Sequence, residues 1–270
     1  MKKKLLIVSG CSWSNVKFKS DQHPELDTSW PKWHELLADM LGMELISLGK
    51  NGAGQEYIFN SLVECITELD DEDKDRIGLV IPAWSRSPRR DYQADGLWRN
   101  HRFDACGDIK YMLSRSLRYY YQFQIFCERF DIPYKQIHML DALSFPINEI
   151  PEFYAYRHRL PSPSARKIDR SPVIGEINRS YAIGNEPRRM SRHCPDTQKM
   201  IDYTASSSPF YNKLNEENFI GWPLIKAFGG YALDQHVICV SKEKYRVSDQ
   251  DFHPNKLGNE KLASFIYENL

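Results

Sequence analysis

Residues 5–14, Leu-Leu-Ile-Val-Ser-Gly-Cys-Ser-Trp-Ser (LLIVSGCSWS), join a short apolar run to a turn rich in serine. The apolar run predicts a first β-strand over residues 4–9, of the kind that is buried on both faces of a parallel sheet. Small and polar residues follow, and Gly10 permits a tight turn there. The hydroxyl of Ser12 is therefore predicted at the carboxyl end of a strand, where α/β folds expose functional groups.

Strand-like and helix-like patterns alternate along most of the chain. Short apolar runs predict five strands, at residues 4–9, 44–48, 78–83, 134–140 and 236–240. Amphipathic patterns predict helices between them: one capped by Ser29, one opened by the glycine-rich residues 49–54, one at 112–130, one near 219–228 and one at the C-terminus. Parallel strands that alternate with helices predict an α/β fold, a doubly wound three-layer α/β/α sandwich.

This alternation is interrupted once. Residues 141–218 are rich in proline, serine and arginine and show little sustained periodicity. We interpret residues 1–270 as a single domain with a long irregular insertion or cap at about 141–218. Because loops at strand ends select the substrate in such folds, we expect the insertion to set substrate choice.

Composition excludes several classes of protein. The chain has 270 residues, 41% of them hydrophobic, which is typical of a globular protein. Its 36 basic and 36 acidic residues cancel, so no overall field attracts nucleic acid or a membrane surface. The six cysteines are scattered without a CxxC pair, which predicts reduced thiols in a cytoplasmic protein. Phosphate-loop, dinucleotide and metal-binding motifs are absent from the sequence, so we expect no cofactor and no metal.

The N-terminal residues 1–11, MKKKLLIVSGC, share some features with an export signal. They combine basic residues, a short apolar run and a cysteine. However, the run at residues 5–8 is shorter than the roughly 7–15 residues that a signal requires. No apolar run elsewhere approaches the roughly 20 residues of a membrane span. We therefore interpret this segment as the first strand and expect a cytoplasmic location.

A second informative segment lies near the C-terminus, at residues 248–258 (SDQDFHPNKLG). Asp251 and His253 come directly before a helix-like run. A serine nucleophile requires a histidine to accept its proton and a carboxylate to orient that histidine. The pattern predicts Ser12 as nucleophile, His253 as base and Asp251 as the orienting acid. In the folded chain, Ser12 Oγ should then lie within about 3.5 Å of a His253 ring nitrogen.

Together these segments resemble the SGNH hydrolase superfamily, also called GDSL-type esterases and lipases. That family carries four sequence blocks on a five-stranded parallel, flavodoxin-like sheet. Gly10-Cys11-Ser12 lies where the family has Gly-Asp-Ser, so the resemblance implies Ser12 as nucleophile. The final block is similar to Asp251-Phe252-His253-Pro254, which implies the acid and the base.

The second block of the family is similar to residues 48–52, Leu-Gly-Lys-Asn-Gly. The resemblance implies that the Gly52 N–H, together with the Ser12 N–H, forms the oxyanion hole. Gly54 is a close alternative to Gly52.

The chain departs from the family pattern in three places. Cys11 replaces the aspartate of the first block. The acid of the family lies three residues before the histidine, where this chain has Gln250, so Asp249 is an alternative to Asp251. The third block lacks its oxyanion-binding asparagine; this chain has Ala-Trp-Ser-Arg-Ser at residues 83–87.

The missing asparagine needs a substitute, because one oxyanion donor contributes about 3–4 kcal/mol. The Ser85 hydroxyl or the Arg86 guanidinium can donate a hydrogen bond there. With Arg89, this stretch is similar to the WS-x-x-x-R segments of divergent, phage-associated or bacterial branches of the superfamily.

The sequence thus predicts a serine ester hydrolase that acts through an acyl-enzyme on a small-molecule or glycan ester and removes small acyl groups from carbohydrate. Neither nucleic acid nor a membrane is an expected partner, and the sequence leaves the oligomeric state open. The candidate substrate-binding residues are Trp13, Asn51, Trp84, Arg86 and Arg89. Two alternatives stay open: Ser9 or Ser14 as the nucleophile, and a catalytically weak module of the same fold that binds glycan or serves in an assembly.

Overall fold

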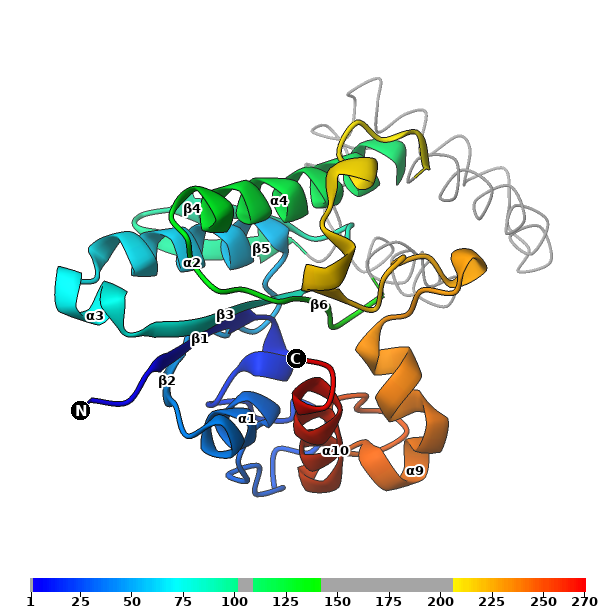
Figure 1. Cartoon of the computed structure of the whole chain (residues 1–270). Helices are drawn as coiled ribbons and strands as arrows, with labels where there is room; N and C mark the ends of the chain where they lie inside the picture. Colours follow the sequence, from blue (N-terminus) through cyan, green and yellow to red (C-terminus); the bar gives the residue numbers. More distant parts are fainter. Residues whose placement is uncertain (1, 102–108, 142–205) are drawn as a thin grey trace.

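The computed structural model describes residues 2–101, 109–141 and 206–270. Its centre is one parallel sheet of five strands (Figure 1). In spatial order these are β2 (Glu44–Ser47), β1 (Leu5–Gly10), β3 (Ile77–Trp84), β6 (Gln136–His138) and β7 (Phe219–Ile220). This is the flavodoxin-like order 2-1-3-4-5, so the predicted fold class is confirmed.

Helices cover both faces of the sheet and complete the three layers (Figure 1). Helices α2 (Gln55–Glu68) and α4 (Ile109–Arg129) lie on one face. Helices α1 (Trp33–Leu41) and α10 (Lys256–Tyr267) pack together on the other. None of the helices in the described ranges is long and apolar enough to cross a membrane.

The middle of the sheet is the core of the protein. All six residues of β1 are buried, because β2 and β3 flank it and helices cover both of its faces. Trp84 at the end of β3 is fully buried and packs against Tyr120 and Phe123 of α4. An apolar run buried on both sides is what the sequence predicted for β1.

Short elements connect the main ones. They are η1 (Ser12–Ser14), α3 (Asp71–Asp75), η3 (Tyr211–Lys213), η4 (Glu216–Asn218), η5 (Lys226–Phe228), the π-helical turn η6 (Asp234–Ile238), η7 (Cys239–Ser241) and α9 (Lys242–Tyr245). Residues 142–205 of the predicted insertion at 141–218 lie outside the described residues.

The prediction placed the fifth strand wrongly. Residues 236–240, predicted as a strand, are helical in η6 and η7, and the strand is β7, within the segment predicted as a helix. A short apolar run fits a strand and a buried helical turn equally well, so its periodicity could not decide between them. Val237 and Ile238 are buried while Val240 is exposed, which fits a helical turn packed on one side.

The predicted cap of the first helix was also wrong. Helix α1 begins at Trp33, and Lys32 occupies the cap position, where its N–H donates to Glu35 Oε2 at 2.7 Å. Ser29 lies before the helix, and its own N–H donates to Asp27.

A hairpin of two antiparallel strands, β4 (Arg90–Ala94) and β5 (Leu97–His101), follows β3 and was not predicted. Its turn is Asp95-Gly96, and both residues have positive φ, 53° and 70°. This is the backbone that an Asp-Gly hairpin turn requires, so the sequence did carry a signal for it. The hairpin contributes directly to the site described below.

Candidate functional site

Ser12 lies at the carboxyl edge of the sheet, where β1 ends. The chain turns at once into the 3₁₀ turn η1, in which the Ser14 N–H donates to the Cys11 carbonyl at 2.9 Å. This turn packs against the loop that follows β2. A Cβ at Gly49 would lie only 1.7 Å from the Ser14 carbonyl oxygen, so this position admits only glycine.

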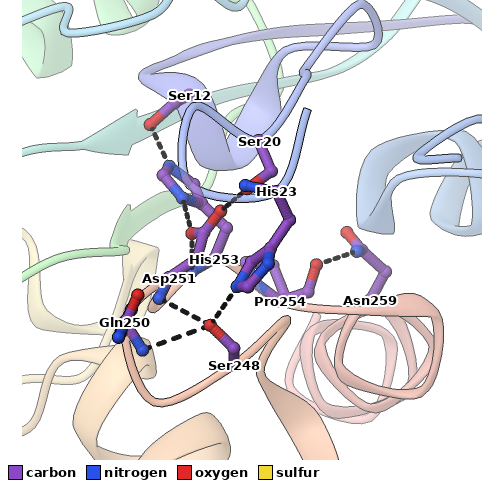
Figure 2. A network of polar contacts seen from close by, with 9 residues as sticks. All are labelled: Ser12, Ser20, His23, Ser248, Gln250, Asp251, His253, Pro254 and Asn259. Carbon is purple, nitrogen blue, oxygen red and sulfur yellow. Dashed lines mark hydrogen bonds and ion pairs between the residues drawn. The ribbon is translucent and has the colours of Figure 1, made fainter. Parts of the chain in front are cut away.

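His253 reaches Ser12 from the other end of the sequence. Its Nε2 lies 2.7 Å from Ser12 Oγ, and its Nδ1 lies 2.5 Å from Asp251 Oδ1 (Figure 2). The predicted distance between Ser12 Oγ and a His253 ring nitrogen, within about 3.5 Å, is therefore confirmed. This hydrogen-bonded chain has the order that activates a serine hydroxyl, with the histidine between the serine and a carboxylate.

Asp251, rather than Asp249, is the carboxylate next to the histidine. Asp251 is buried with 5% of its surface exposed, whereas Asp249 is exposed. Burial raises the pKa of Asp251, but hydrogen bonds from the side chains of His253 and Ser20 outweigh it and lower the pKa to about 2. The Asp251 carboxylate is thus ionised at neutral pH.

The entry to helix α10 fixes the position of His253. Asn255 caps the helix by accepting the Gly258 N–H at 2.9 Å. Asn259, one turn further, is fully buried and donates to the Pro254 carbonyl at 3.0 Å (Figure 2). It also accepts the Trp33 N–H at the start of α1, so the histidine loop is tied to both helices of this layer.

Aromatic residues surround the His253 ring. Phe18 packs on it with a centroid distance of 4.2 Å, and Trp13 lies at 6.3 Å. Both side chains are only 6% exposed. Trp13 was predicted to bind substrate, but its burial makes it part of the wall behind His253.

The loop after β2 comes close to the turn that carries Ser12. The Asn51 side chain accepts a hydrogen bond from Asn15 at 2.9 Å, and the Asn51 carbonyl accepts one from Asn100 of β5 at 3.2 Å. Gly52 has a positive φ of 76°, and a Cβ there would lie 2.7 Å from the Asn100 side chain. Asn51, a predicted substrate-binding residue, therefore links the two loops of the site.

Gly54, the alternative to Gly52, has another role. It is the N-cap of α2, and its N–H donates to both carboxylate oxygens of Asp91 at 3.0 Å. Asp91 Oδ2 also accepts the Tyr57 N–H at 2.9 Å, and the Asp91 N–H donates to Glu56 at 3.1 Å. The hairpin thus supplies the capping side chain that a glycine lacks.

Asp91 is therefore a buried carboxylate of the fold rather than part of a solvated surface. Asp91 is 5% exposed. Burial raises the pKa of Asp91, and the backbone hydrogen bonds from Tyr57 and Gly54 oppose that rise. In the sequence, helices α2 and α3 and strand β3 lie between Gly54 and Asp91, so no local capping motif could reveal the contact.

The segment after β3 is held mainly by internal hydrogen bonds. Ser85 has no exposed surface; its N–H donates to Gln55 Oε1 at 3.1 Å, and its carbonyl accepts from Gln55 Nε2 at 2.6 Å. Arg89 donates to Ser85 Oγ at 2.6 Å and to the Ala53 carbonyl at 3.0 Å. Arg89 was predicted to bind substrate. Instead, it joins the segment after β3 to the loop after β2.

Arg86 is the other predicted substitute for the missing asparagine. Burial is the main cause that lowers the pKa of Arg86, and Arg89 adds to it, while Asp234 and Cys11 act in the opposite direction. Of the two predicted substitutes for the missing asparagine, Arg86 is half-buried and Ser85 fully buried.

The prediction that Trp84 binds substrate was wrong. Its side chain is fully buried, and its Nε1–H donates to Gln136 Oε1 at 2.9 Å. Its aromatic character serves the core between β3 and α4. In the part of the chain that the structure describes, no cluster of His, Cys, Asp or Glu is arranged to hold a metal ion.

Comparison of the sequence with protein-family models and with curated proteins finds no match.

The hairpin cap can be tested by stability measurements. We expect Asp91→Asn to lower the free energy of unfolding by about 1–2 kcal/mol, because the amide removes the negative charge at the N-terminus of α2 and puts an NH₂ group where Oδ1 accepts the Gly54 N–H. Asp95→Asn is the matched control: Asp95 is exposed in the hairpin turn, where asparagine also tolerates positive φ, and we expect a change within about 0.5 kcal/mol. Urea unfolding measures both, and equal effects would contradict the capping role.

Proposed function

We propose that this protein is a serine ester hydrolase of the SGNH type. The observation that carries the proposal is the hydrogen-bonded chain from Ser12 Oγ through His253 to Asp251 at the carboxyl edge of a flavodoxin-like sheet. The three residues come from opposite ends of the sequence. Packing of the core would not by itself place a histidine between a serine hydroxyl and a carboxylate.

In the proposed reaction, Ser12 Oγ attacks the carbonyl carbon of an ester. His253 Nε2 accepts the serine proton and then gives it to the departing alcohol. Asp251 holds the Nδ1 proton and stabilises the imidazolium, since its carboxylate is ionised. In the second half of the cycle, water gives a proton to Nε2 and attacks the acyl carbon; the acyl–Oγ bond breaks, and Nε2 returns the proton to Ser12 Oγ.

The oxyanion that forms on attack needs donors. We assign this role to the N–H groups of Ser12 and Gly52, because the Gly54 N–H is used by Asp91. For the position of the missing asparagine, the burial of Ser85 favours Arg86 as the third donor. A guanidinium next to a developing negative charge also stabilises it electrostatically.

The substrate class that we propose is an ester with a small acyl group. An exposed aromatic ring at the site would favour a carbohydrate substrate, because it could stack on a sugar. Trp13 and Trp84 are buried, so neither offers such a ring to a ligand. Trp98 and Trp222 are half-buried, so a small-molecule ester and a glycan ester both stay candidate substrates.

One observation favours the second candidate function, a catalytically weak module of the same fold that binds a ligand or serves in an assembly. The segment after β3 has no asparagine, and the polar groups of Ser85 bond to Gln55 and Arg89. Without a substitute, the loss of one oxyanion donor would slow the reaction by about 10²–10³.

An ester hydrolysis assay separates the two candidates. With p-nitrophenyl acetate, we expect Ser12→Ala to reduce the hydrolysis rate about a thousandfold or to the rate without protein, because the nucleophile is lost. Ser14→Ala is the matched control, since Ser14 is a buried serine two residues away whose hydroxyl has no hydrogen-bond partner among the residues that the structure describes. We expect it to keep most of the activity. Equal rates for wild type and Ser12→Ala would favour the second candidate.

The identity of the acid gives an independent prediction. Asp251→Asn should lower kcat by about 10³–10⁴, because an amide no longer selects the Nδ1–H tautomer of His253 or stabilises its charge. Asp249→Asn, an identical change at an exposed position in the same loop, should change kcat less than twofold. A larger loss for Asp249→Asn would reverse the assignment.

A further inference from the structure

The carboxylate of Asp251 has a second hydrogen-bond donor besides His253. Ser20 Oγ lies 2.5 Å from Asp251 Oδ2, while His253 uses Oδ1 through both its ring Nδ1 at 2.5 Å and its backbone N–H at 3.1 Å (Figure 2). Ser20 and Asp251 are 3% and 5% exposed. Each oxygen of the buried carboxylate therefore faces a different donor, and the two ends of the sequence meet at this group.

The direction of the Ser20 hydrogen bond follows from its other partner. Ser20 Oγ accepts the backbone N–H of His23 at 2.9 Å, and a backbone N–H can only donate. Asp251 is ionised and can only accept, so the Ser20 hydroxyl proton points at Oδ2.

A second contact fastens the Ser20 segment to the loop of Asp251. Ser248 Oγ accepts the N–H groups of Gln250 and Asp251, at 3.1 Å and 3.0 Å. Its own proton is thus left for His23 Nε2, which lies 2.7 Å away (Figure 2). His23 then carries its proton on Nδ1, which faces Glu25 at 3.5 Å. The Ser20–His23 turn and the 248–251 turn hold each other in place.

We infer that Ser20 is a positioning residue that fixes the Asp251 carboxylate for His253. A carboxylate that is held at one oxygen only can rotate about the Cβ–Cγ bond. With Oδ2 bound to Ser20, Oδ1 stays directed at the imidazole Nδ1. The role of Ser20 in turnover rests on the proposed function. Its effect on the Asp251–His253 hydrogen bond does not.

The first test uses nuclear magnetic resonance and needs no substrate. The His253 Nδ1 proton, bonded to Asp251, gives a deshielded signal whose exchange with water reports the strength of that bond. In Ser20→Ala we expect the signal to move and its exchange to become about tenfold faster, the effect of one hydrogen bond to a charged group. Ser61→Ala is the matched control, because it also removes a buried serine hydroxyl bond, to Ser9 at 2.8 Å, that does not reach Asp251.

The second test measures ester hydrolysis. Ser20→Ala should lower kcat about tenfold with KM unchanged, since Ser20 acts through Asp251 rather than on the substrate. In an Asp251→Asn background the same change should have less than a twofold effect, because the carboxylate it positions is gone.

The outcomes are distinct. An unchanged Nδ1 signal in Ser20→Ala, equal changes in Ser61→Ala, or a full tenfold loss in the Asp251→Asn background would overturn the inference. A changed signal in Ser20→Ala alone supports it, even if the wild-type protein hydrolyses no ester. A wild-type protein that hydrolyses no ester would count against the proposed function only.

Discussion

The site depends on one contact between the two ends of the chain, the hydrogen bond between Ser12 Oγ and His253 Nε2. Neither residue can reach the other without the sheet. Ser12 leaves β1, a strand buried at the centre, and His253 precedes α10, a helix that packs on α1 beneath the same strands. The fold therefore holds a serine and a histidine from opposite ends of the sequence in contact.

The neighbouring loops hold this contact through polar groups rather than through the core. Asn259 ties the histidine loop to the first turn of α1, and Asn51 ties the Ser12 turn to the loop after β2. The β4–β5 hairpin adds Asp91, which caps α2 and so sets where the Gly52 loop ends. Such bonds are directional, so they can fix the orientation of side chains where apolar packing fixes only their position.

How much of this could be predicted depends on how local the signal is. The apolar run at residues 5–8 has no helical period and is followed by a glycine and small polar residues, so β1 and the place of Ser12 were predictable. Ser12, Asp251 and His253 could be chosen because their chemistry restricts the residue types. In contrast, β7 has two residues and the run at 236–240 suits either structure, so the fifth strand was misplaced.

The partners of the site were not predictable for a different reason. Asp91 acts on a helix that begins 36 residues earlier, at Gln55, and Ser20 contacts an aspartate 231 residues away. Such contacts leave no spacing pattern in one sequence. Trp84 illustrates the converse error: a tryptophan in a candidate motif can belong to the core, and only its burial decides this.

The central claim is that His253 activates Ser12 as a nucleophile. Its most direct test is the reaction of the folded protein with a fluorophosphonate probe, followed by peptide mass spectrometry. We expect a single adduct on Ser12, formed at least a hundredfold more slowly in His253→Gln. An adduct on Ser14 or another serine, or labelling of Ser12 at the same rate without the histidine, would contradict it.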